Sequence, residues 1–229
     1  GWNLQNQIRE EVSFTDGRIY VSGTKKQRGK RKRADFILYL KPNIPLAIIE
    51  AKDDTHSVDA GIQQGINYSE ILDIPFVFST NGKEFLFHDK TTKNNKEKIL
   101  SLENFPSPSA LWEKYKVYKQ LDNNTEKYVA TNYFIDSDSH SPRYYQQIAI
   151  NRTIESISKN KTKKNLLVMA TGTGKTYVAF QIIYRLWKAG LKKRILYLAD
   201  RTALIDQTVR GDFRHFKDSL TVIKKKKID

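Results

Sequence analysis

The chain has 229 residues, of which 39% are hydrophobic and 11% aromatic, a composition typical of a globular protein rather than a disordered or collagen-like one. Its length corresponds to one domain plus part or all of a second. Forty Lys and Arg residues against 25 Asp and Glu give a net charge of +15, which indicates a polyanionic partner such as a nucleic acid. The lack of cysteine excludes disulfides, cysteine-ligated zinc, iron–sulfur clusters and thiol nucleophiles.

The hydrophobic runs are short, and the N-terminus carries no secretion signal. No apolar stretch approaches the length of about 18 residues that a membrane span needs, and residues 1–6 have neither a basic n-region nor an apolar h-region. We therefore expect a soluble, cytoplasmic protein with no membrane partner. Because the first residue is not Met, we also expect an upstream helix to be missing from the sequence.

Charge is distributed unevenly along the chain. Residues 1–130 contain 20 basic and 17 acidic side chains, a net charge of +3, whereas residues 131–229 contain 20 and 8, a net charge of +12. A polar stretch over residues 137–142, which ends in Pro142, provides a natural break. We predict two domains, residues 1–137 and residues 138–229.

A basic run covers residues 25–33 and is interrupted only by Gln27 and Gly29. Such a run is typical of a solvated, mobile loop, and a nuclear-localisation signal is a weaker alternative. Its role is left open at this point.

The first domain is predicted to contain two strands, a helix and a β-hairpin. The strands cover residues 35–40 and 46–52, and a Pro-bearing turn joins them. The apolar spacing of Val58, Ile62 and Ile66 predicts the helix. The hairpin covers residues 76–87 and has an Asn-Gly turn.

Acidic and basic side chains stand together at the end of the second strand. Both faces of this strand are apolar until Glu50, so we expect it to be covered on both sides. Glu50 and Lys52 lie on one face, and they either form a structural ion pair or are placed for chemistry. On the following helix, Gln64 and Tyr68 are neighbours one turn apart.

Asp35, followed by Glu50-Ala51-Lys52, resembles the Asp…(Asp/Glu)-x-Lys motif of the restriction-endonuclease-like, PD-(D/E)xK, nuclease superfamily. Gln64-x-x-x-Tyr68 is similar to a motif of its RecB-like members. The resemblance implies an α/β nuclease fold in which Asp35, Glu50, Lys52, Gln64 and Tyr68 form the catalytic site. Two carboxylates from adjacent strands can hold Mg²⁺, so Asp35 and Glu50 are the candidate metal ligands.

Other assignments of these residues stay open. A Glu50–Lys52 ion pair with Asp35 as a solvated cap would need no catalysis, and Ala34 stands where the motif has Pro. Chemically, Asp53, Asp54 and Asp59 are also possible metal ligands, but we expect them to be solvated or to cap the helix. The acidic residue that the family supplies from its first helix cannot be fixed: Glu10 and Glu11 are candidates, and the alternative is a residue upstream of this sequence.

The second domain is predicted to open with a phosphate-binding loop. A buried strand over residues 166–169 precedes the loop, and an amphipathic helix over residues 177–188 follows it. Glycines let backbone N–H groups surround a phosphate, the lysine reaches the β- and γ-phosphates, and the final threonine can ligate Mg²⁺. Met169 occupies the first glycine position of the general motif, and the loop instead resembles motif I of superfamily 2 helicases and translocases. This resemblance implies that the second domain is the start of a RecA-like P-loop motor domain. The predicted ATP-binding residues of the loop are Thr171, Gly172, Thr173, Gly174, Lys175 and Thr176.

Two flanking segments fit this resemblance. Residues 142–150 are similar to the Q-motif of the same superfamily, which implies that Gln146 recognises adenine; the alternative is a polar residue at a helix start. A strand over residues 194–199 is predicted to lead into a segment that resembles motif Ia, where Arg201 and Thr202 are candidates for phosphate contact. Because no Asp-Glu box follows, we expect ATP hydrolysis to be incomplete in this fragment.

The order of these motifs resembles the N-terminal part of the R subunit of type I restriction enzymes. The resemblance implies an ATP-dependent type I site-specific deoxyribonuclease that translocates and cleaves double-stranded DNA, with modification and specificity subunits as partners and with Mg²⁺ and ATP as cofactors. One alternative is another nuclease–helicase fusion in DNA repair or phage defence. The other is a DNA-binding module whose nuclease site has decayed.

Overall fold

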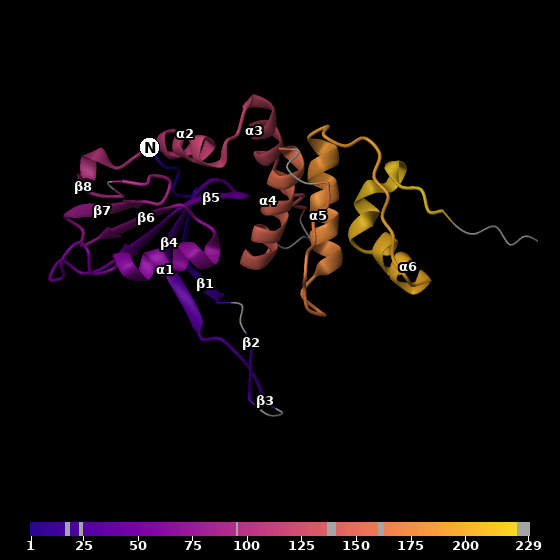
Figure 1. Ribbon diagram of the computed structural model, residues 1–229, viewed down its shortest axis with the longest axis horizontal. Coiled ribbons are helices and arrows are strands. Elements are labelled where there is room, and N and C mark those ends of the chain that lie inside the picture. The colour runs from indigo at the N-terminus through magenta and orange to yellow at the C-terminus, as the bar shows by residue number, and fades with distance from the viewer. Residues whose placement is uncertain (17–18, 23–24, 95, 137–140, 160–162, 224–229) are drawn as a thin grey trace, which may run out of the picture.

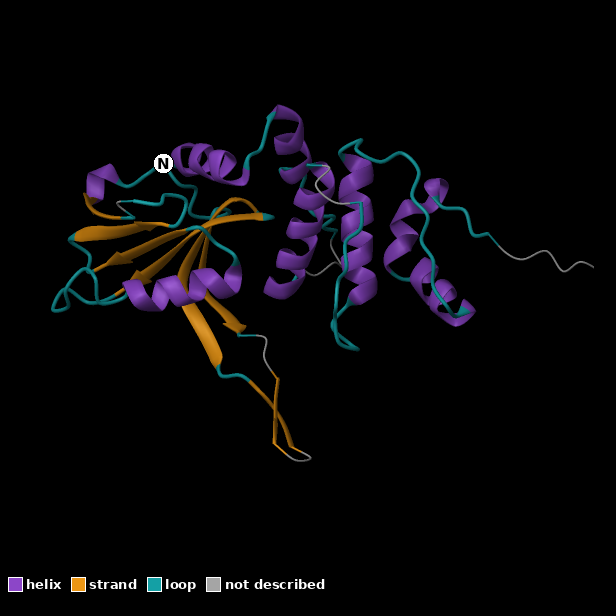
Figure 2. Cartoon of the chain, in the orientation of Figure 1, coloured by secondary structure: helices purple, strands orange, loops and turns teal. Residues whose placement is uncertain are grey.

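The computed structural model describes residues 1–16, 19–22, 25–94, 96–136, 141–159 and 163–223. A mixed six-stranded sheet forms its first half (Figures 1 and 2). Only β5 and β6 pair in parallel; the other neighbours are antiparallel. In spatial order the strands are β1 (Ile8–Thr15), β4 (Arg31–Lys41), β5 (Ile44–Ala51), β6 (Phe76–Thr80), β7 (Glu84–Asp89) and β8 (Glu97–Ser101).

Helices cover both faces of this sheet. Helix α1 (Ile62–Leu72) connects β5 to β6 and packs on one face, where Ile37 and Ile48 belong to a buried cluster. Helix α2 (Pro108–Lys119) follows a 3₁₀ turn, η1 (Leu102–Asn104), and packs on the opposite face (Figure 1). The predicted order of strand, strand, helix and hairpin is confirmed, although α1 begins at Ile62 and leaves Val58 in the preceding turn.

The basic run is not a loop, so that prediction was wrong. Residues 25–28 form β3 (Lys25–Arg28), which pairs with β2 (Ile19–Ser22), and residues 31–33 begin β4. Ladder hydrogen bonds in the β2–β3 ribbon, and between β1 and β4, satisfy the backbone of this segment despite its charge. The ribbon projects away from the six-stranded sheet (Figure 1).

The second half of the chain is helical. Helices α3 (Asn123–Val129), α4 (Tyr144–Ser158) and α5 (Lys175–Lys188) lie side by side, and α6 (Thr202–Arg210) and a 3₁₀ segment, η2 (Asp212–Ser219), follow (Figure 1). The helix predicted after the phosphate loop is therefore confirmed as α5.

Neither strand predicted beside the phosphate loop is formed. Residues 166–169 and 194–199 make no sheet, and Leu166, Val168 and Leu198 are 87%, 88% and 78% exposed. A strand needs a neighbouring strand to accept and donate its backbone hydrogen bonds, and the described part of the chain offers these segments none. The prediction of a buried strand at residues 166–169 is thus wrong for this structure.

The hydrophobic core continues across the predicted domain boundary. Ile150 and Ile154 of α4 and Leu186 of α5 belong to the same buried cluster as Leu38 of β4 and Trp112 of α2. Residues 137–140 of the predicted break lie outside the described residues. None of the helices in the described ranges is long and apolar enough to cross a membrane.

Candidate functional site

Asp35 and Glu50 lie on neighbouring strands at the same end of the sheet. Phe36 pairs with Ile49 in the antiparallel β4–β5 register, so the next residue toward this end on each strand is Asp35 or Glu50. Asp35 Oδ2 accepts a hydrogen bond of 2.9 Å from the Ala51 backbone N–H, which orients the carboxylate toward β5. The hairpin therefore brings together two acidic groups that are 15 positions apart in the sequence.

Glu50 is fully buried, at 0% exposure, and its two carboxylate oxygens differ in their contacts. Oε2 accepts a hydrogen bond of 2.6 Å from Gln64 Nε2, whereas Oε1 is buried and has no hydrogen-bond partner. Burial, followed by repulsion from the Asp35 carboxylate, raises the pKa of Glu50 to about 7. The backbone of Asp35, followed by the positive charge of Lys52, opposes this rise in the pKa of Glu50.

Helix α1 approaches Glu50 closely because two glycines face the sheet. A Cβ atom on Gly61 would lie 2.9 Å from Glu50 Cβ and 2.9 Å from Ser79 Oγ, and one on Gly65 would lie 2.5 Å from Val77 Cγ1. Ser79, buried beside Glu50 in the parallel β5–β6 register, accepts a hydrogen bond of 3.1 Å from the Gly61 N–H. This close packing lets the Gln64 amide reach the carboxylate.

Tyr68 and Lys52 complete the set of predicted nuclease residues. Tyr68 is half-buried, and its ring packs edge-on against Phe14 at a centroid distance of 5.0 Å. Burial, followed by the nearby negative charges of Glu50 and Asp35, raises the pKa of Tyr68. The Lys52 backbone N–H donates to the Thr80 carbonyl at 2.9 Å, which ties the residue just after β5 to β6.

These side chains fit a divalent cation as a partner. Two adjacent carboxylates repel each other, and Glu50 keeps a buried oxygen without a partner; a cation between Asp35 and Glu50 would correct both features. Within the described ranges no cluster of three or more His, Cys, Asp or Glu residues is arranged to hold a metal. The protein therefore offers two carboxylates, which suits Mg²⁺ because this ion usually keeps several waters and binds substrate phosphates.

The other acidic candidates lie apart from this pair. Asp53 is exposed, and hydrogen bonds from Thr55 and then His56 lower its pKa to about 2. Asp54 lies 3.6 Å from the Lys83 ammonium. The expected solvation of these two residues is confirmed, whereas helix capping is not, since α1 has Gly61 at its N-cap and no side-chain cap.

The remaining acidic candidates also lie outside any larger cluster. Asp59 is exposed, and its backbone carbonyl, not its carboxylate, accepts from the Ile62 N–H. Glu10 and Glu11 lie on β1 and not on a helix, and Glu11 forms an ion pair with Arg33 at 3.1 Å.

The phosphate loop adopts backbone angles that favour glycine. Gly172 and Gly174 have φ values of 78° and 83°, and α5 begins at Lys175. The Lys175 ammonium donates to the carbonyls of Met169 at 3.4 Å and Ala170 at 3.2 Å. Thr171, Gly172 and Lys175 are exposed, and Thr173 and Thr176 are half-buried, so the loop is open to a ligand.

Gln146 contacts this loop directly. Its Nε2 donates to the Thr173 carbonyl at 2.9 Å, and its Oε1 accepts from the Arg143 N–H at 2.9 Å. The Tyr145 hydroxyl also donates to the Thr173 carbonyl, at 3.4 Å. An amide has two donor hydrogens and two acceptor lone pairs, so each end of the Gln146 side chain keeps one position for a ligand.

A pocket of about 360 Å³ opens beside the loop and Gln146. Its other lining residues include Asp136 and Arg143 before α4, Tyr177 at the start of α5, and Asp212 and His215 after α6. Burial is the main cause that raises the pKa of Asp212. Arg201 and Thr202 lie exposed at the start of α6 and do not line this pocket.

Comparisons with known proteins match both halves of the chain. The family model for the N terminus of the type I restriction enzyme R protein matches residues 2–96. The chain is 49% identical, over its whole length, to the EcoAI endonuclease subunit of a type I restriction enzyme from Escherichia coli. It is also similar to a solved fragment assigned as the HsdR subunit of a type I restriction enzyme from Vibrio vulnificus YJ016, with 43% identity and a TM-score of 0.68 over 82% of this chain and 35% of that one. The chain belongs to the R subunit family of type I restriction enzymes.

Two further matches describe the extent of this R subunit sequence. The chain spans 28% of the length of the EcoAI subunit. It is also 27% identical to the EcoKI endonuclease subunit from Escherichia coli strain K12, in an alignment that covers 81% of this chain and 19% of that subunit. The family model for the res subunit of type III restriction enzymes matches residues 139–229, the part that contains the phosphate loop. The prediction of an R subunit is confirmed.

Three residues of the candidate site were missed from the sequence. Gly61, Gly65 and Ser79 contact Glu50 or set the position of α1 beside it. The spacing of the two glycines, four apart on one helix face, is a signal of close packing that could have been recognised. Ser79 carried no such signal, because its position depends on the pairing of β5 with β6.

Proposed function

We propose that this chain contains the nuclease centre of a type I restriction enzyme, built on a PD-(D/E)xK fold, and that it hydrolyses phosphodiester bonds of double-stranded DNA. The observation that carries the proposal is the carboxylate pair. Glu50 is buried with an unpartnered oxygen directly beside Asp35, and Lys52 follows two residues later. A structural ion pair or a decayed site would not require a buried, unsatisfied carboxylate oxygen, because burial of such a group costs free energy.

Asp35 and Glu50 would hold Mg²⁺, which supplies Lewis-acid stabilisation of a phosphate and lowers the pKa of an attacking water. The protein's own groups have distinct tasks. Gln64 holds Glu50 Oε2 and leaves Oε1 available, and the Ala51 N–H fixes the orientation of Asp35. Lys52 places a positive charge where the phosphate develops negative charge, and Tyr68 supplies a hydroxyl on the same helix face as Gln64.

We further propose that residues 138–229 form the start of an ATP-driven translocase domain. The exposed loop, the N-terminus of α5 and Lys175 suit the phosphates of ATP. Gln146 keeps one donor and one acceptor position toward the neighbouring pocket, which is the pattern that adenine N6 and N7 require. Arg201 and Thr202 remain candidates for contact with the DNA backbone.

The complete enzyme would act with modification and specificity subunits that select the DNA, as the resemblance implies. The family assignment argues against an unrelated repair or phage-defence fusion. A chain that covers 28% of the EcoAI subunit contains part of such a machine, so the full-length protein is the proper subject of a functional test.

Glu50→Ala in the full-length R subunit, assembled with its partner subunits, is expected to abolish DNA cleavage while ATP turnover continues. Lys52→Ala is expected to reduce cleavage by about 10²–10³-fold, the effect of removing one group that stabilises transition-state charge. Lys98→Ala, an exposed lysine on β8, is the matched control and should cleave normally. Cleavage by Glu50→Ala at the wild-type rate would refute the site assignment.

Lys175→Ala is expected to stop both ATP turnover and cleavage. Agarose-gel cleavage and phosphate release, measured in the same reaction, separate the two centres. A Lys175→Ala protein that still hydrolyses ATP would refute the assignment of the phosphate loop.

A further inference from the structure

Arg185 is a positive charge buried inside the protein at 1% exposure. It lies on α5, the helix that starts with Lys175 of the phosphate loop. Ten residues separate the two side chains, so they are about 15 Å apart along one continuous helix. A displacement of the loop that moves α5 as a rigid rod also moves Arg185.

The Arg185 guanidinium bonds to two neutral oxygens. NH1 donates to Asn151 Oδ1 on α4 at 2.7 Å, and NH2 donates to the Val129 carbonyl, at the end of α3, at 2.7 Å. The guanidinium also lies over the Tyr133 ring, 5.3 Å from its centroid. The contacts with Val129 and Tyr133 join α5 to residues on the other side of the predicted domain boundary, whereas Asn151 lies on the same side as Arg185.

Packing alone does not explain a charge at this place. Nε is buried without a hydrogen-bond partner, and burial lowers the pKa of Arg185. A buried cation loses its hydration, and a well-packed apolar side chain of similar size is often as stabilising or more so. Burial of the Arg185 charge therefore costs folding free energy, and a functional role would explain why an arginine is found here.

The hydrogen bonds continue from Arg185 to the hairpin that carries the nuclease carboxylates. Asn43, 1% exposed in the β4–β5 turn, donates to the same Val129 carbonyl at 3.0 Å. Asn151 Nδ2 donates a hydrogen bond of 2.9 Å to the Asn43 carbonyl. The path from α5 to the β4–β5 hairpin thus consists of Arg185, Asn151, Val129 and Asn43, which we call the interhelix network.

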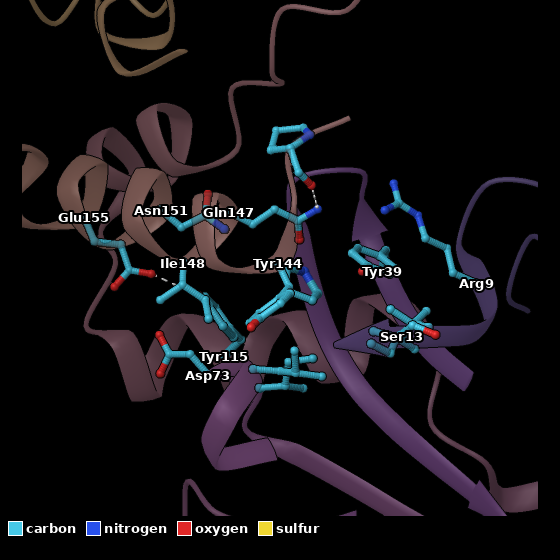
Figure 3. A pocket seen from close by; sticks show the side chains of 16 residues that line it. Arg9, Ser13, Tyr39, Asp73, Tyr115, Tyr144, Gln147, Ile148, Asn151 and Glu155 are labelled. Carbon is cyan, nitrogen blue, oxygen red and sulfur yellow. Dashed lines mark hydrogen bonds between the residues drawn. The ribbon is translucent and has the colours of Figure 1, made fainter. Parts of the chain in front are cut away.

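A second layer of contacts holds α4 against the sheet. Figure 3 shows Tyr144, Gln147, Asn151 and Glu155 of α4 on one side of a pocket whose other wall includes Tyr39 of β4. Glu155 accepts a hydrogen bond of 3.0 Å from the Tyr115 hydroxyl of α2. These contacts join α4 directly to α2 in the nuclease part of the chain.

We propose that Arg185 is a positioning residue that couples the phosphate loop to the nuclease hairpin through the interhelix network. The proposal rests on the proposed function, since it assigns the regulation of that nuclease to the nucleotide state of the loop. A change of ligand at the loop shifts α5, and the two bonds of Arg185 transmit the shift to Val129 and Asn151. Asn43 then passes it to β4 and β5, the strands of Asp35 and Glu50.

The test compares cleavage with ATP turnover in the full-length R subunit assembled with its partner subunits. Arg185→Met keeps an unbranched apolar side chain that reaches about as far as Nε and removes the guanidinium group with both of its hydrogen bonds. We expect its ATP turnover to stay within about twofold of wild type and its cleavage per ATP hydrolysed to fall at least about tenfold, or about 1.4 kcal/mol in free energy. Arg185→Lys should recover part of this loss, because an ammonium keeps the charge but not the planar fork.

Two further variants keep the test decisive. Asn43→Ala does not touch α5, yet it should lower cleavage per ATP in the same way, and the double variant should show no additional loss. Lys188→Met, an exposed lysine on the same helix, is the control and should behave as wild type. If Arg185→Met unfolds below the assay temperature, Asn43→Ala alone decides.

The outcomes separate this proposal from the proposed function. A parallel loss of ATP turnover and cleavage in the variants, or no loss of either, overturns the coupling role. A wild-type complex that neither hydrolyses ATP nor cleaves DNA overturns the proposed function itself.

Discussion

The close approach of α1 to β6 makes Gly65 a sensitive test of the nuclease site. In Gly65→Ala the new Cβ would lie 2.5 Å from Val77 Cγ1, a fully buried atom on a central strand. Ordinary carbon–carbon contacts are about 3.5–4.0 Å, so the helix must move outward by about 1 Å. The Gln64–Glu50 distance of 2.6 Å would then grow to about 3.6 Å, which no longer forms a hydrogen bond.

The expected cost in activity is larger than the expected cost in stability. Overpacking typically costs about 1–3 kcal/mol, and the better helix propensity of alanine returns about 1 kcal/mol, which leaves a net loss of about 0–2 kcal/mol. A displacement of about 1 Å in an active site can cost about 10² in rate. We therefore expect Gly65→Ala to fold and to hydrolyse ATP, but to cleave DNA about a hundredfold more slowly.

Cleavage rate, ATP turnover and thermal unfolding of the full-length R subunit check this prediction. Glu70→Ala is the matched control, because it places alanine on the exposed face of the same helix, where no packing conflict arises. Cleavage by Gly65→Ala within about twofold of wild type would refute the reasoning, since it would mean that the position of α1 against Glu50 is immaterial.

Three other predictions follow from the carboxylate pair. The folded-state pKa of Glu50, about 7, lies above its ordinary value of 4.5. Without divalent cations, the stability that Glu50 contributes should therefore be complete below about pH 4.5 and be lost as the pH rises through 7. Thermal melts of Glu50→Gln should lack this pH dependence. Asp35→Asn removes the neighbouring negative charge, so the same transition should move to lower pH, and an unchanged midpoint would argue against the repulsion. EDTA should abolish cleavage, and adding Mg²⁺ to the metal-free protein should raise the melting temperature of wild type but not of Glu50→Gln.

Much of the nuclease part could be predicted because its signals are local. Alternating and continuous apolar runs marked β4 to β7, and an Asn-Gly turn marked the β6–β7 hairpin. The pairing of Asp35 with Glu50 followed from two strands joined by a short turn. What local signals could not supply was the contact between α1 and β6, because the parallel pairing that buries Ser79 beside Glu50 joins residues far apart in the chain.

The phosphate-loop part was harder to predict because a strand forms only where a neighbouring strand completes its backbone hydrogen bonds. Residues 166–169 and 194–199 have the apolar pattern of buried strands, yet Leu166, Val168 and Leu196 are 87%, 88% and 69% exposed. Helix α5 forms regardless, since its backbone hydrogen bonds lie within the segment. The two predicted strands therefore need tertiary partners to form, whereas the helix does not.

The charge difference between the two halves also takes on a different meaning. It suggested two separate domains, but the buried cluster that includes Leu38, Trp112 and Ile150 spans both halves, and Arg185 bonds across the boundary. A hinge between independent domains would be expected to bury little and to be polar and wet. A shared apolar core and a buried guanidinium instead join α5 to residues on both sides of this boundary, which is the arrangement that the proposed coupling between the phosphate loop and the nuclease hairpin requires.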